Sequence, residues 1–249
     1  MATIGIFDSG SGGLSVYREI VKVLPQERYV YFADNGHCPY GGKTAAYIQD
    51  RARAVTEILL SLGADLIVVA CNTATAAAIA TLRTEYPAVA FIGMEPAVKP
   101  AALGTESGVI GVLATAGTLK GSKYLTTKGR FEEDVTIVEH VGQGFVELVE
   151  NGILDGPEAE ATVRASLQPL LDAGADRIVL GCTHYPFLRP VIERIAGPGV
   201  EVIDPAPAVA RQTLHMLEER GIPTGQGPFS VDLYFSGQPE ALQRIYRLL

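Results

Sequence analysis

The chain has 249 residues, of which 47% are hydrophobic and 19% charged, and its formal net charge is -8. This length suffices for one large domain or two modest ones, and the apolar fraction excludes a disordered chain. The acidic balance, without any run of Lys and Arg, excludes a typical nucleic-acid-binding protein and favours small-molecule partners.

Short apolar runs alternate with longer helical patterns along the whole chain. The runs that predict strands are Thr3–Phe7, Tyr29–Phe32, Leu66–Ala70, Ala90–Ile92, Val109–Leu113, Thr136–Val138, Arg177–Leu180, Val200–Ile203 and Ser230–Phe235. The patterns that predict helices include Thr44–Leu62, Thr73–Glu85, Ala159–Ala173 and Phe187–Ile195. This alternation predicts an α/β fold with mostly parallel sheets flanked by helices. In such sheets ligands bind beyond the carboxyl ends of the strands.

An internal repeat links the two parts of the chain. Residues 63–71 read GADLIVVAC and residues 174–182 read GADRIVLGC, so six of nine positions are identical. Each copy predicts a helix end, a buried strand and then a cysteine, Cys71 or Cys182. A chance match between such common residues is the alternative. The repeat predicts two pseudo-symmetric α/β domains, each with one cysteine at its strand ends.

Two crossovers are expected between these domains, at Pro96–Gly104 and at 204–207. The first domain then comprises residues 1–97 and 208–249, and the second comprises residues 98–207. The active site is expected in the cleft between them.

Two cysteines facing each other suit racemisation at Cα. One base removes the proton on one face and an acid returns a proton on the other, so Cys71 and Cys182 would act as thiolate and thiol in turn. The residues after each cysteine, Asn72-Thr73 and Thr183, suit the opening of a helix, whose N-terminus favours the thiolate. As an alternative, a cysteine at the end of a buried strand is often only a small core residue.

Polar residues follow the other strands as well. Asp8 and Ser9 come after the first strand and begin a glycine-rich turn, so Asp8 would bind the substrate ammonium, orient Cys71 or merely cap a turn. His184 would hydrogen-bond the Cys182 thiolate or only cap a helix. Backbone N–H groups near Gly41 would receive a carboxylate, unless this is a plain surface turn.

No cofactor or metal is expected. The Gly10–Gly13 loop lacks the phosphate-binding patterns, and no lysine lies in a Schiff-base context. The adjacent pair His37-Cys38 is a weak metal signal, and Cys38 is assigned no role. With neither a signal peptide nor an apolar run of membrane length, a cytoplasmic protein is expected.

Four ordered motifs resemble those of bacterial glutamate racemases: FDSGSGG at 7–13, PYG at 39–41, ACNTA at 70–74 and GCTHYP at 181–186. The resemblance implies interconversion of L- and D-glutamate without a cofactor, supply of D-glutamate for peptidoglycan, and a possible homodimer. It implies that Cys71 and Cys182 are the bases, supported by Asp8, His184 and an acid that maps to Glu150 or, less directly, Glu147. The substrate contacts that it implies are Asp8, Ser9, Tyr40, Gly41, Asn72, Thr73, Thr115, Thr118 and Thr183.

Three rival functions stay open at this point. An aspartate racemase of the same superfamily would keep both cysteines and change the side-chain pocket. A non-catalytic amino-acid-binding protein would keep the cleft alone. A redox dithiol protein would need Cys71 and Cys182 close enough to form a disulfide.

Overall fold

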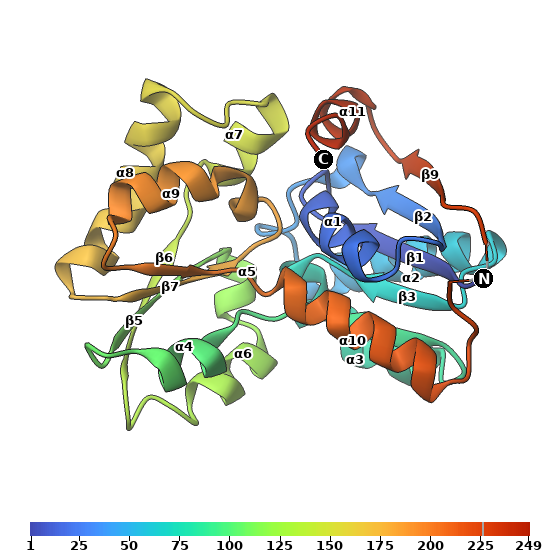
Figure 1. Cartoon of the computed structure of the whole chain (residues 1–249), viewed down its shortest axis with the longest axis horizontal. Coiled ribbons are helices and arrows are strands. Elements are labelled where there is room, and N and C mark those ends of the chain that lie inside the picture. Colours follow the sequence, from blue (N-terminus) through green and yellow to red (C-terminus); the bar gives the residue numbers. More distant parts are fainter. Residues whose placement is uncertain (226) are drawn as a thin grey trace.

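The computed structural model describes residues 1–225 and 227–249 and has two lobes, each built on one parallel sheet (Figure 1). The strands of the first sheet are β1 (Thr3–Asp8), β2 (Arg28–Ala33), β3 (Leu66–Val69), β4 (Ala90–Gly93) and β9 (Ser230–Phe235). The strands of the second are β5 (Val109–Ala114), β6 (Thr136–Val141), β7 (Arg177–Gly181) and β8 (Glu201–Ile203). Every described strand pair is parallel, which confirms the predicted α/β fold.

Helices cover both faces of each sheet. The first lobe carries α1 (Leu14–Val23), the short 3-10 helix η1 (Asn35–His37), α2 (Ala45–Ser61), α3 (Asn72–Glu85), α10 (Ala206–Glu219) and α11 (Glu240–Tyr246). The second carries α4 (Val98–Gly104), α5 (Ala116–Leu119), α6 (Ser122–Lys128), α7 (Phe145–Asn151), α8 (Pro157–Asp172), the 3-10 helix η2 (Tyr185–Leu188) and α9 (Arg189–Ala196). Among the described residues no helix is long and apolar enough to cross a membrane.

The two sheets have the same strand order, which explains the sequence repeat. The first runs β4-β3-β1-β2-β9 and the second β8-β7-β5-β6, so β1 corresponds to β5 and β3 to β7. The added strand β9 pairs with β2 and completes the first sheet with the last part of the chain. The two copies of the repeat therefore end at equivalent strand ends, after β3 and after β7.

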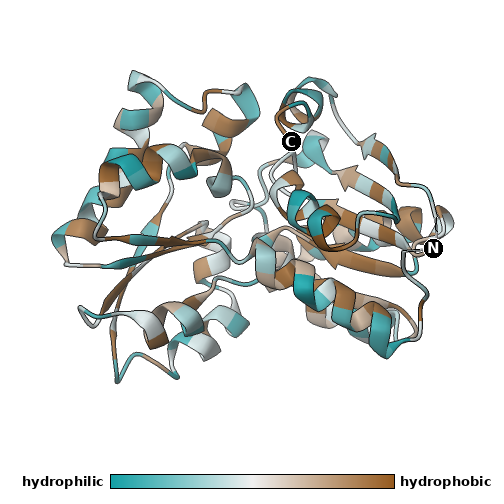
Figure 2. Cartoon of the chain, in the orientation of Figure 1, coloured by the Kyte–Doolittle hydropathy of each residue, from teal (hydrophilic) through white to brown (hydrophobic). Residues whose placement is uncertain are grey.

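Alternating side chains of the central strands fill separate cores on the two faces of a sheet. Ile4 and Ile6 of β1 pack into the cluster that includes α1 and α10, whereas Phe7 packs into the cluster that includes α2 and α3. Burial on both faces is the reason that these strands read as continuous apolar runs. Figure 2 shows these strands as mainly hydrophobic, with the helices more mixed.

The expected crossover at Pro96–Gly104 is largely helical, since α4 occupies Val98–Gly104. The second expected crossover leads directly into α10, which begins at Ala206 and packs against α1 and β4 of the first lobe. The domain boundaries at residues 97 and 207 stay a prediction.

Candidate active site

One narrow cavity lies where the carboxyl ends of both sheets meet. The first lobe contributes Ser9, Pro39, Tyr40, Gly41, Cys71, Asn72 and Thr73, and the second contributes Thr115, Val146, Cys182, Thr183 and His184. Its volume of about 20 Å³ is near the space that one water molecule needs. Both lobes therefore line this cavity, and they leave little space between them.

Cys71 is the N-cap of α3 and is 5% exposed. Its Sγ accepts from the N–H of Ala74 at 3.4 Å and donates to Oγ of Ser9 at 3.6 Å. Burial and the charge of Asp8 nevertheless raise the pKa of the Cys71 thiol to about 12, outweighing these hydrogen bonds. The helix start lowers the pKa of Cys71 as expected, but burial outweighs this effect, and Cys71 is a thiol in this state.

Cys182 follows β7 directly, but no α-helix opens beside it. The 3-10 helix η2 begins at Tyr185, and α9 begins only at Arg189. Pro186 and Pro190 explain this difference from the prediction, because a proline inside an α-helix lacks the N–H donor and clashes with the preceding turn, so each of them lies instead in the first turn of its own helix. A side chain supplies the local charge instead, since Nδ1 of His184 lies 3.8 Å from Sγ of Cys182.

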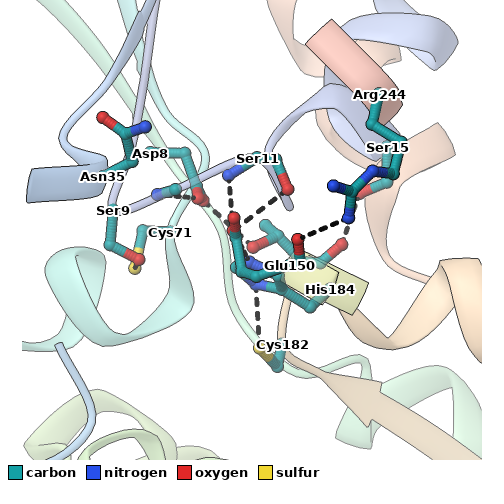
Figure 3. A network of polar contacts seen from close by, with 12 residues as sticks. Asp8, Ser9, Ser11, Ser15, Asn35, Cys71, Glu150, Cys182, His184 and Arg244 are labelled. Atoms are coloured by element: carbon teal, nitrogen blue, oxygen red, sulfur yellow. Dashed lines mark hydrogen bonds and ion pairs between the residues drawn. The ribbon is translucent and has the colours of Figure 1, made fainter. Parts of the chain in front are cut away.

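His184 forms an ion pair with Glu150 of α7. Its Nε2 lies 2.7 Å from Oε1 of Glu150, which also accepts from the N–H of Ser11 at 2.8 Å and from Oγ of Ser11 at 3.0 Å. Figure 3 shows Glu150 joined to Ser11 and His184, and His184 joined to Cys182. Glu147, one turn earlier, lines a neighbouring surface pocket instead. The geometry thus places Glu150 beside His184.

His184 and Glu150 each stabilise the charged form of the other. Burial alone would lower the pKa of His184, but hydrogen bonds to Cys182 and Glu150 outweigh it and raise this pKa well above its ordinary value. Burial alone would raise the pKa of Glu150, but the hydrogen bond and charge of His184, with help from Ser11, lower it. A protonated His184 beside an ionised Glu150 follows, so a positive charge lies next to Sγ of Cys182.

Asp8 lies behind the cavity wall. It is fully buried, and it accepts from the N–H of Gly10 at 2.8 Å and from the hydroxyl of Thr183 at 3.0 Å. Burial raises the pKa of Asp8, although His184, Gly10 and Thr183 oppose this effect. Asp8 reaches the cavity through Thr183, so its contacts favour a positioning role over direct binding of a substrate.

The glycine-rich turn allows close approach of side chains from the other lobe. A Cβ on Gly12 would lie 2.3 Å from Nδ1 of His184, and a Cβ on Gly10 would lie 2.4 Å from Oε1 of Glu150. Such distances are too short for any real Cβ contact. A larger residue at either position would therefore displace the His184–Glu150 pair.

Threonine hydroxyls connect the lobes on the other side of the cavity. Oγ1 of Thr73 lies 2.8 Å from Oγ1 of Thr115, which lies 2.9 Å from Oγ1 of Thr118. Beside them Asn72 is 2% exposed, and both polar atoms of its amide lack a hydrogen-bond partner among the described residues. An unpartnered buried amide on a cavity wall indicates that a ligand completes its hydrogen bonds.

The loop that carries Tyr40 and Gly41 is held from outside the cavity. The Tyr40 hydroxyl donates to Asp34, and the same carboxylate accepts from Nε and Nη2 of Arg51 at 2.9 and 2.8 Å. Burial alone would raise the pKa of Asp34, but the hydrogen bonds from Arg51 and Tyr40 lower it. His37 also contacts this carboxylate, at 3.0 Å. His37 therefore contacts Asp34, whereas the thiol of the neighbouring Cys38 lies close to Glu150 and His184.

The structure gathers the predicted site residues around one cavity. Ten of them line it, whereas Asp8, Glu150 and Thr118 contact residues that do. Sequence reasoning missed Ser11, Arg51 and Val146. Ser11 carried a signal, because it lies between two glycines in the turn that was already singled out. Val146 and Arg51 gave none, since they look like ordinary helix residues.

Comparison with known proteins agrees with this geometry. The family model described as Asp/Glu/Hydantoin racemase matches residues 4–213. A glutamate racemase from Ectopseudomonas mendocina is 47% identical over 248 residues, which is 100% of this chain and 94% of that protein. Two solved glutamate racemases, from Bacillus anthracis (31% identity, TM-score 0.89) and from Escherichia coli with L-glutamate and the activator UDP-MurNAc-Ala (33% identity, TM-score 0.87), each cover 99% of this chain and 93% of their own.

Proposed function

The chain belongs to the Asp/Glu/hydantoin racemase family, and from this premise we propose that it is a glutamate racemase whose two bases are Cys71 and Cys182. One observation carries the proposal. Two buried thiols from equivalent strand ends of opposite lobes line the same cavity. A substrate between them presents one face of its Cα to each sulfur.

The charges around the two sulfurs define a starting state for turnover. Cys71 is a thiol, whereas the protonated His184 places a positive charge beside the sulfur of Cys182. The Cys182 thiolate takes the Cα proton, and the electron pair of the broken C–H bond stays on the substrate as a carbanion. The Cys71 thiol then donates its proton to the opposite face. The reverse reaction starts from the Cys71 thiolate and the Cys182 thiol.

Hydrogen-bond donors in the cavity would hold the substrate and stabilise the carbanion. The Asn72 amide, which has no partner among the described residues, and the N-terminus of α3 would both face a ligand in this cavity. The hydroxyls of Thr73, Thr115 and Thr183 also line the cavity, with Ser9 beside Cys71. Such preorganised donors act where charge develops, so no added cofactor is required by this route.

The lobes have to part before glutamate can enter. A cavity of about 20 Å³ holds roughly one water molecule, far less than an amino acid needs. The hydrogen bonds between Thr73 and Thr115 and between Thr183 and Asp8 join residues of different lobes. Binding therefore includes opening and closure of the cleft, which excludes water from the carbanion.

The wider role follows from the resemblance to glutamate racemases. We propose that the D-glutamate formed is used for peptidoglycan in the cytoplasm, and that the enzyme acts as a homodimer. The rival aspartate racemase is disfavoured by the 47% identity to a glutamate racemase over the full chain. A binding protein without activity would not need two equivalent thiols on one cavity.

Deuterium exchange in D2O tests the proposal. The wild-type protein, given L-glutamate without a cofactor, should lose optical rotation and place deuterium at Cα. Cys71→Ala and Cys182→Ala should each abolish inversion, because each lacks one of the two bases. Each variant should still exchange the Cα proton of one enantiomer, and the two variants should prefer opposite enantiomers. Exchange with aspartate alone, or near wild-type inversion by either variant, would overturn the proposal.

A further inference from the structure

A third thiol lies beside the His184–Glu150 pair, and the reaction proposed above does not use it. Cys38 ends η1 in the first lobe, whereas Glu150 lies on α7 and His184 follows β7 in the second. One ligand atom from each of these three residues lies within 4.8 Å of the other two. A sulfur, an imidazole nitrogen and a carboxylate oxygen therefore converge from three separate elements.

The backbone at Gly10 gives independent evidence for this convergence. A Cβ built on Gly10 would lie 2.4 Å from Oε1 of Glu150 and 3.1 Å from Sγ of Cys38. Both side chains are therefore packed over the same glycine. Cys38 is only partly buried and the Glu150 side chain is 20% exposed, so an ion from solvent can reach the cluster.

The donor set selects a particular class of cation. Thiolate, imidazole and carboxylate are the ligands of Zn²⁺ in proteins, whereas Mg²⁺ prefers oxygen ligands alone. In a tetrahedral Zn²⁺ site, metal–ligand bonds of about 2.0 to 2.3 Å place the ligand atoms about 3.3 to 3.6 Å from one another. The described hydrogen bonds to the Glu150 carboxylate all end on Oε1, which leaves Oε2 available for an ion.

We propose that Cys38, Glu150 and His184 form an inhibitory site for Zn²⁺ or a similarly thiophilic divalent cation. The ion would bind Nε2 of His184, the atom that now faces Glu150, and would separate the two partners. His184 could then no longer hold a proton between Glu150 and Cys182. Inhibition rests on the proposed racemase function, whereas binding of the ion does not.

Binding is measured first, by optical titration with Co²⁺ as a probe for the Zn²⁺ site. The double variant Cys71→Ser/Cys182→Ser leaves Cys38 as the sole thiol of the chain. It should show the charge-transfer absorption of a Co²⁺–thiolate bond, and addition of Cys38→Ser should remove that absorption. His37→Ala in the same background is the matched control and should keep it, because His37 contacts Asp34 instead. If the double variant shows no such absorption, the proposal fails whatever the activity of the protein.

Inhibition is measured second, by racemisation in rising Zn²⁺ with EDTA reversal. Cys38→Ser should leave activity without metal unchanged and weaken Zn²⁺ inhibition by roughly tenfold or more. Mg²⁺ at the same concentrations should not inhibit. Equal inhibition of wild type and Cys38→Ser would overturn the proposal and assign the ion to Cys71 and Cys182. A wild type with no racemase activity would instead refute the proposed function and leave the Co²⁺ result to stand by itself.

Discussion

Nε2 of His184 lies 2.7 Å from Oε1 of Glu150, and the opposite nitrogen of the same ring faces the sulfur of Cys182. A carboxylate on α7 thus acts on a thiol at the end of β7 through one imidazole. Because the ring is 2% exposed, solvent cannot replace either partner.

Glu150→Gln should lower kcat about 100-fold or more, because the amide no longer balances the charge on His184. Glu147→Gln is the matched control on the same helix and should change kcat less than about threefold, since Glu147 lines a different pocket. Steady-state racemisation by both variants checks this. Similar losses in the two variants would show that α7 as a whole, and not Glu150, supports the reaction.

The stability difference between wild type and Glu150→Gln should depend on pH from both sides. The pKa of Glu150 is lowered by folding, so its contribution is present above the ordinary pKa of Glu and is lost as the pH falls through the lowered value. The pKa of His184 is raised, so its contribution is complete below the ordinary pKa of His and is lost as the pH rises through the raised value.

The difference in free energy of unfolding is therefore expected to be largest between about pH 4.5 and 6.5, at about 1 to 3 kcal/mol. It should shrink in more acidic and in strongly alkaline solution. Urea unfolding of both proteins across this range measures it. A difference that does not change with pH would mean that the two groups are not an ion pair in the folded protein.

Gly12→Ala should displace the His184 ring, since the new Cβ would lie 2.3 Å from Nδ1. We expect a loss of kcat of about 100-fold and a free energy of unfolding lower by about 1 to 3 kcal/mol. Gly42→Ala is the matched control in the nearby loop, because a Cβ there meets no atom of the described residues within 4 Å. Kinetics and denaturant melts of the two variants separate a local clash from general intolerance of alanine.

Asn72→Ala should raise KM without a matching loss of stability. The amide is buried and unpartnered, so its removal costs no hydrogen bond in the free protein, whereas the substrate loses one. An increase in KM of about 10-fold is expected, with the free energy of unfolding within about 1 kcal/mol of wild type. Thr56→Val tests the same energetics away from the cavity, because the buried Thr56 hydroxyl also lacks a hydrogen-bond partner in the described part of the chain. That variant should keep both KM and stability.

The sequence predicted the strands and the two equivalent sheets well, because local sequence patterns determine them. Each predicted strand is present within a few residues, and the repeat at 63–71 and 174–182 correctly indicated two equivalent strand ends. Short apolar runs that are flanked by helices fit few structures other than the buried strands of a parallel sheet. The roles assigned to individual site residues stay predictions.

Other features depend on contacts between distant residues, and no local pattern contains them. The pKa of Cys71 is raised because Asp8 and the whole surrounding core act on it, although its helix cap by itself would lower it. The contact between Ser11 and Glu150 joins residues 139 positions apart. The missing α-helix directly after Cys182 is the exception, because Pro186 and Pro190 are visible in the sequence.

The place of β9 at the edge of the first sheet has a consequence for the order in which the protein is made. The strands β5 to β8 lie within one continuous stretch, so the second sheet can assemble while synthesis continues. The first sheet begins at Thr3 but needs Ser230–Phe235 to cover β2. Until the ribosome releases that segment, the nascent chain carries an open strand edge, the kind of surface that pairs with other chains and aggregates.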